Sequence, residues 1–157
     1  MSVALKKADG DLFISAAGRG EEVSGPTKVD QELFDLYTTE YDARRNWGSK
    51  VHPSFFKAVP SPNHLRAAVF AEVQAANGRI LQKQANDLYL DTETEAIREF
   101  TDVTVFVDPG TYNVLFLSTA AVGDPVTKVG RQLFITFKPL STRHVLPPPF
   151  PTGILKT

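Results

Sequence analysis

The chain has 157 residues, of which 42% are hydrophobic and 22% charged, a composition that excludes a chain disordered throughout and fits one ordinary domain. Its 17 Lys plus Arg and 18 Asp plus Glu leave a net charge of −1, so no overall field attracts nucleic acid or an acidic membrane. The absence of cysteine excludes disulfides, thiolate metal sites and a cysteine nucleophile.

The apolar runs are too short to cross a membrane. Residues 103–107, one of the longest runs, have the length of a strand, whereas a bilayer needs about 20 residues. Lys6 and Lys7 follow a short apolar stretch, which is the reverse of the order in a secretory signal. We expect a protein made in the cytosol that works there or in an assembly built there.

The N-terminus predicts a β-hairpin followed by a loop. Apolar residues at 3–5 and 12–14 flank a turn at 8–11 that contains Asp-Gly, a typical hairpin sequence. The glycines and small polar residues of 15–25 then predict a surface loop.

A first helix is predicted from residue 27 to about residue 44. Apolar residues recur there at helical spacing, and Thr27 with Asp30 resembles a capping box. An irregular connector with three prolines follows as far as Pro62, and it contains Trp47, the only tryptophan.

Two further helices are predicted, about 62–77 and 79–98. Ser61 before a proline is a good helix start, and Gly78 is a typical stop. Residues 92–95 read as a capping box for a last short helical segment. The pair would form a bent helical hairpin.

The sequence of residues 103–137 predicts antiparallel strands. Residues 103–107 and 112–118 alternate in polarity around the turn sequence 108–111, and 131–137 predicts a third strand. Helices in the middle with strands at both ends predict a single α+β domain over residues 1–139, in which the N-terminal hairpin contributes to the sheet.

Residues 140–157 form a proline-rich C-terminal extension. The sequence PPPFP at 147–151 favours polyproline II and cannot join a sheet interior. Apolar side chains in such an extension either pack on their own domain or bind a neighbour. These side chains are Val145, Leu146, Phe150, Ile154 and Leu155.

Catalytic and metal-binding patterns are not found. The three histidines are scattered and do not form a metal-ligand spacing, and phosphate-binding glycine motifs are absent. Carboxylate pairs suited to glycoside hydrolysis lie at predicted turns, caps or solvated helix faces. They are Asp9 with Asp11, Asp30 with Asp35, and Glu93 with Glu95. We therefore expect no enzyme activity, no cofactor and no metal.

Basic residues beside an aromatic ring occur once. Arg44 and Arg45 near Trp47 could suggest nucleic-acid stacking, but without a wider basic surface a helix-end contact is the better interpretation. What remains is a protein that interacts through edge strands and an apolar extension.

The order of these elements resembles the baseplate wedge and sheath-initiator family of contractile phage tails and related contractile injection systems. Three stretches carry the resemblance. LKKADGDLFI at 5–14 is similar to the family's opening hairpin. The helix that runs into RRNWGS at 44–49 is similar to its first helix and basic or glycine turn. IREFTDVTV at 97–105 is similar to its helix end and the "Asp-Val-x-Val" entry into an antiparallel hairpin.

The resemblance implies a non-enzymatic virion protein of the tail baseplate that initiates sheath polymerisation by offering sheet edges to sheath subunits. Its partners would be the tail sheath protein and the baseplate wedge and hub proteins, with six copies around the tail and assembly in the host cytoplasm. Many family members carry Glu-Pro-Arg at the helix-to-strand turn, whereas this chain has Ile97-Arg98-Glu99. The docking role of that motif therefore carries over only to Arg98.

Eight residues are the candidate partner-binding residues of this interpretation. They are Trp47, Arg98, Val103, Val105, Leu133, Ile135, Leu146 and Phe150. Three alternatives stay open: another tail or head–tail connector subunit that forms rings by itself, a cell-wall hydrolase with two carboxylates across one cleft, and a peptide-binding module with a defined groove.

Overall fold

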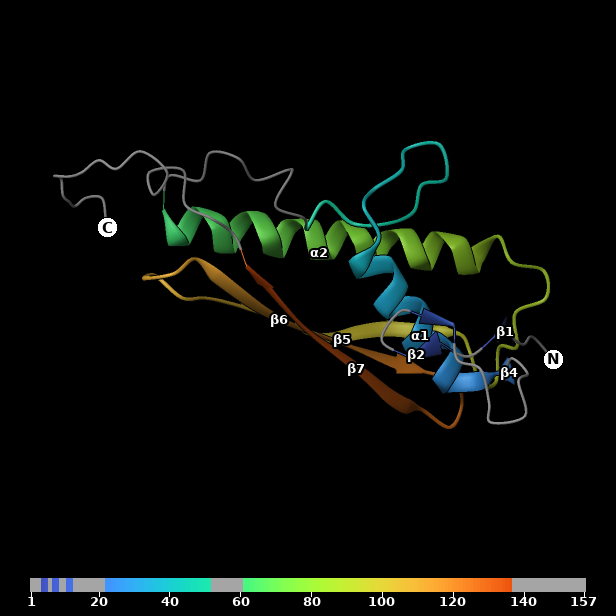
Figure 1. Ribbon diagram of the computed structural model, residues 1–157. Coiled ribbons are helices and arrows are strands. Elements are labelled where there is room, and N and C mark those ends of the chain that lie inside the picture. Colours follow the sequence, from blue (N-terminus) through green and yellow to red (C-terminus); the bar gives the residue numbers. More distant parts are fainter. Residues whose placement is uncertain (1–3, 6, 9–10, 13–21, 52–60, 137–157) are drawn as a thin grey trace, which may run out of the picture.

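Two helices lie on one face of a three-stranded antiparallel sheet in the computed structural model of the chain (Figure 1). The structure describes residues 4–5, 7–8, 11–12, 22–51 and 61–136. Its elements are β1 (Ala4–Leu5), β2 (Lys7–Ala8), β3 (Asp11–Leu12), β4 (Glu22–Val23), α1 (Gly25–Thr38), α2 (Pro62–Ala85), β5 (Ile97–Val107), β6 (Asn113–Val122) and β7 (Thr127–Thr136). The predicted α+β class is confirmed. Neither helix of this described part has the length and apolar character needed to span a membrane.

The sheet has the order β5-β6-β7, with β6 in the centre. The turn predicted at 108–111 joins β5 to β6, where Val107 pairs with Val114. Alternate residues of β6 face the helices and are fully buried, as expected for a sheet with one covered face. These residues are Val114, Phe116, Ser118, Ala120 and Val122.

α2 is one continuous helix, so the predicted break at Gly78 is wrong. The residues on either side of the glycine belong to one buried stripe that includes Val73, Ala76 and Ile80. Packing of this stripe offsets the cost of about 1 kcal/mol that a glycine adds inside a helix. The predicted start is confirmed, because the Ser61 hydroxyl accepts a hydrogen bond from the His64 backbone N–H at 3.2 Å.

The helix predicted over 79–98 ends early, at Ala85. Residues 92–95 form turns instead of a last helical segment, and 97–100 already belong to β5. The Gln84 side chain stabilises this change from helix to strand. Its amide N–H donates to the Glu95 carbonyl at 2.9 Å, and its amide oxygen accepts from the Ile97 N–H at 2.8 Å. Pairing of β5 with β6 therefore decides the structure of a segment whose local sequence favours a helix.

α1 ends at Thr38, six residues before the predicted end at 44. The chain then folds back on itself, with bridges that join Glu40 to Ser49 and Asp42 to Trp47. Gly48 permits this close return: its φ is +94°, and a Cβ there would lie 2.7 Å from the Glu40 carbonyl oxygen.

The N-terminal strands do not join the main sheet, which corrects the prediction. β2 pairs with β3, whereas β1 pairs with β4; Asp9 and Gly10 of the predicted turn lie outside the described residues. Each of these strands has only two residues, too few to add a lasting edge to the sheet. The remaining residues of the predicted strands and loop, 3 and 13–21, lie outside the described residues, as do 52–60 and 137–157.

Candidate interaction surface

A buried polar cluster joins both helices to the sheet. The Tyr37 hydroxyl of α1 contacts Asn77 Oδ1 of α2 and lies 2.9 Å from Ser118 Oγ of β6. The Asn77 amide donates to the same Ser118 oxygen at 3.2 Å. Burial raises the pKa of Tyr37 to about 12, and the hydrogen bond with Ser118 partly opposes this. Because all three side chains are at most 3% exposed, no substrate reaches them, and the cluster is structural.

A buried carboxylate holds the start of α1. Glu95 is 1% exposed; its Oε2 accepts from the Gly25 N–H at 3.2 Å and its Oε1 lies 3.5 Å from Lys28 Nζ. The residue before this helix makes no side-chain cap, so Glu95 supplies the negative charge that the helix N-terminus favours. The sequence placed Glu95 in a solvated capping box, and only the fold could show its burial beside residues about 70 positions away.

Other carboxylates of the candidate pairs serve contacts between elements. The Trp47 indole N–H donates to Asp35 at 2.9 Å, and Arg131 of β7 lies 3.0 Å from Asp30. Within the described ranges no group of three metal-ligating side chains gathers. These contacts give Asp35 and Asp30 a structural role, whereas Asp9 of the predicted Asp9–Asp11 pair lies outside the described residues.

The outer strands of the sheet carry four of the candidate partner-binding residues. Val103, Val105, Leu133 and Ile135 all lie on the face that packs against the helices, and Val105 is 9% exposed. Their side chains are therefore directed into the domain. What β5 and β7 can offer a partner is the backbone of their outer edges, where no other strand of the described residues pairs with them.

The two edges differ in regularity. β5 has register shifts between Ile97 and Glu99 and between Phe100 and Asp102. All ten residues of β7 pair with β6 without a shift. Bulges twist an edge strand and oppose the addition of another strand, so the regular β7 is the better template.

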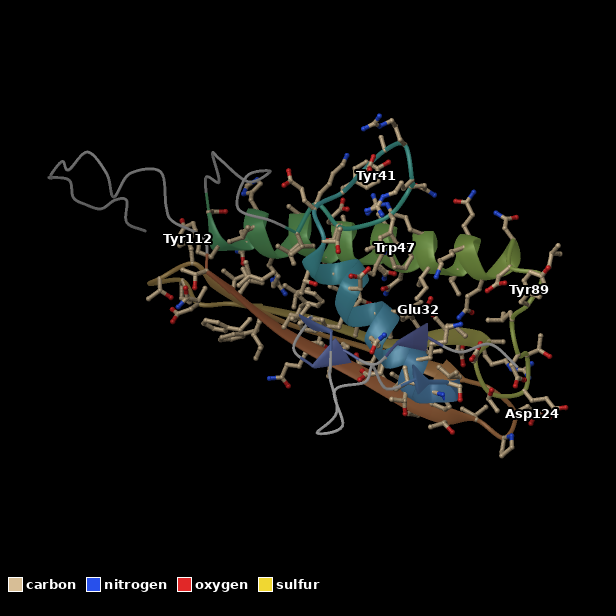
Figure 2. The ribbon with its side chains drawn as sticks, turned by 45° about the vertical axis from the view of Figure 1, so that its right-hand side comes forward. Glu32, Tyr41, Trp47, Tyr89, Tyr112 and Asp124 are labelled. Carbon is tan, nitrogen blue, oxygen red and sulfur yellow. The ribbon has the colours of Figure 1, made fainter. Side chains whose placement is uncertain are left out.

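Trp47 and Arg98, predicted to contact partners, have neighbours within the chain. Trp47 is half-buried against the core, with Lys83 Nζ of α2 5.2 Å from its ring centre. Arg98 is exposed on β5; its Nε donates to the Gly123 carbonyl at 3.3 Å, and its guanidinium lies 4.0 Å from Asp124. Figure 2 shows Trp47 beside the helices and Asp124 at the far end of the sheet from Tyr112. Leu146 and Phe150 lie outside the described residues.

The sequence interpretation missed an apolar row on the face of the sheet opposite the helices. Phe106, Leu115 and Phe134 are register partners across all three strands, and we call them the outer row. The phenylalanines are 62% and 63% exposed. The available signal was that β5 is apolar on both faces near its end, since Phe106 lies between two buried valines.

No protein-family model matches this sequence, and a search of curated proteins found no significant match. The resemblance to the baseplate family therefore stays a prediction, and the proposal below rests on the edges of the β5-β6-β7 sheet.

Proposed function

We propose that this protein is a structural subunit of a contractile phage tail baseplate, which docks on the wedge and initiates sheath polymerisation by offering sheet edges to sheath subunits. The single observation that carries the proposal is the β5-β6-β7 sheet, whose outer strands each leave one long edge free of any described strand. The family resemblance supplies the identity of the partners. The proposed role involves no catalysis. The partners would be the sheath, wedge and hub proteins around a sixfold tail.

Strand addition requires little from the side chains. An incoming strand forms main-chain hydrogen bonds with the edge, and side chains only select the partner. β7 suits this because it is regular over its whole length and contacts α1 through Arg131 and Asp30, which hold it in place. We therefore assign β7 as the receiving edge and β5, with its irregular half, as the edge protected from pairing.

The experiment mixes substoichiometric protein with soluble sheath protein of the same particle and follows light scattering and negative-stain images. Seeded sheath-like tubes are the expected result. Hydrogen exchange on the same mixture should slow at the amides of β7 more than at those of β5, because added main-chain hydrogen bonds protect the receiving edge.

A matched pair of variants distinguishes the edges. Phe106 and Phe134 are equally exposed and lie in the same row, on β5 and β7 respectively. Lysine on an edge strand opposes strand addition. Phe134→Lys should therefore reduce seeding while Phe106→Lys retains it, and the opposite pattern would overturn the assignment of β7.

The second candidate, a tail or head–tail connector, has a different signature. It forms closed rings by itself, since a head-to-tail interface closes by rotation. Rings from the isolated protein, together with no seeding of sheath, would replace the sheath-initiator proposal with the connector.

The wedge-docking role of Arg98 is tested separately. Arg98→Ala should weaken binding to purified wedge proteins, with Arg66→Ala, a change at an exposed arginine of α2, as the control. Equal binding by both variants would remove Arg98 from the docking surface.

A further inference from the structure

The outer row is an exposed apolar surface on the face of the sheet opposite the helices. Two phenylalanines, each more than 60% exposed, flank Leu115 of the central strand. Leu117, two residues further along β6, extends the apolar surface in the next row. Aromatic side chains line the sites at which many domains bind proline-rich segments.

The spacing of the two phenylalanines fits one backbone conformation. Neighbouring strands lie about 4.8 Å apart, so backbones two strands apart are separated by about 9.6 Å. A polyproline II helix has three residues per turn and rises about 3.1 Å per residue, which places side chains three positions apart about 9.3 Å from one another. A polyproline segment that crosses the strands can therefore meet both rings from one side.

This chain contains such a segment close by. β7 ends at Thr136, two residues after Phe134, and the sequence continues for 21 residues that include PPPFP at 147–151. The ten residues 137–146 span up to about 33 Å when extended, far more than the width of the row. A short tether gives an effective concentration of order millimolar, so even a weak site would be filled by its own chain.

The distribution of charged residues favours contact between this segment and the outer row. Residues 144–155 contain no Asp, Glu, Lys or Arg. The next row of the sheet, Thr104–Leu117–Gln132, is also uncharged, whereas the far end of the same face carries a row with Glu99 and Lys128. A charge-free apolar segment therefore matches the end of the sheet where the chain leaves β7.

We propose that residues 146–150 dock in polyproline II conformation across Phe106, Leu115 and Phe134 of their own chain. The contact covers the apolar face of the sheet and leaves the backbone edges open. It goes beyond the proposed function, because it concerns a different surface and needs no partner.

The test uses a spin label in the full chain. The protein has no cysteine, so Thr152→Cys gives a single attachment site for a nitroxide. We expect loss of the amide NMR signals of the outer row, with recovery when the nitroxide is reduced. Phe106→Ser combined with Phe134→Ser should restore the signals, whereas Phe70→Ser, at an exposed phenylalanine of α2, should not.

A mixed sample identifies the chain that docks. Isotope-labelled protein without the nitroxide is combined with unlabelled protein that carries it. Signal loss that occurs only when the isotope label and the nitroxide are on the same chain supports docking within one chain. Signal loss in the mixture would show that a second copy supplies the segment, and full signals in both samples would show that the segment does not bind the row; either result overturns the proposal.

Discussion

The two faces of the β5-β6-β7 sheet are made by the same strands but have opposite relations to the rest of the protein. On the inner face Phe116 is fully buried against the helices, whereas on the outer face Phe106 and Phe134 are more than 60% exposed. Both faces are apolar at the end near the β5–β6 turn. We therefore expect an apolar residue of this sheet to contribute most to stability where a helix covers it.

The largest effect is expected for Phe116→Ala. This side chain is fully buried and meets the Tyr37 ring edge-on at 5.2 Å between ring centres. Truncation of a buried phenylalanine costs about 3–5 kcal/mol of unfolding free energy, which denaturant unfolding would measure. A loss no larger than that of an outer-face variant would remove the distinction between the faces.

The second largest effect is expected for Glu95→Ala, which should lower the unfolding free energy by about 3 kcal/mol. The change removes a buried charge partner of Lys28 and the acceptor of the Gly25 N–H. Glu93→Ala, at an exposed side chain two residues earlier, is the control. Equal stability of the two variants in urea would show that the start of α1 does not depend on Glu95.

Tyr37→Phe should cost about 1–2 kcal/mol at neutral pH, because it removes a hydroxyl from a buried hydrogen-bonded cluster. It should also change the response to alkali. The folded pKa of about 12 lies above the ordinary value of 10, so the wild type keeps this stability below pH 10 and loses about 3 kcal/mol as the pH rises through 12. If the unfolding free energies of wild type and Tyr37→Phe changed in parallel between pH 10 and 12, this prediction would be wrong.

The smallest effect is expected for Phe106→Ser and Phe134→Ser measured singly. Their rings are mostly exposed, so unfolding free energy should change by about 0.5 kcal/mol or less. Thermal unfolding at several protein concentrations provides the measurement. A loss of unfolding free energy as large as that of Phe116→Ala would mean that the outer row stabilises the fold as much as the inner face does.

Features set by neighbouring residues could be predicted. The β5–β6 turn is an example: its Asp108 side chain accepts from the Gly110 N–H at 2.9 Å, an interaction within the turn itself. The Ser61 cap is another. Helix ends at Thr38 and Ala85 were missed, because they depend on Trp47 folding back and on β5 pairing with β6.

The candidate surface was predicted only in part. The sequence indicated edge strands, but it could not show that the side chains of Val103 and Leu133 point toward the helices while Phe106 and Phe134 point away. Two apolar sets alternate along the same strands, and alternation does not say which set is covered. The outer row was missed for this reason.

The sequence by itself determined the α+β class, the main hairpin and the start of α2, because hydrophobic period, turn residues and caps act over a few positions. Only the tertiary structure decided that α2 continues through Gly78, that Glu95 caps a helix 70 residues earlier, and that Phe106 and Phe134 lie on the face of the sheet opposite the helices. These features depend on burial between segments distant in the chain, and burial can outweigh local preferences of about 1 kcal/mol.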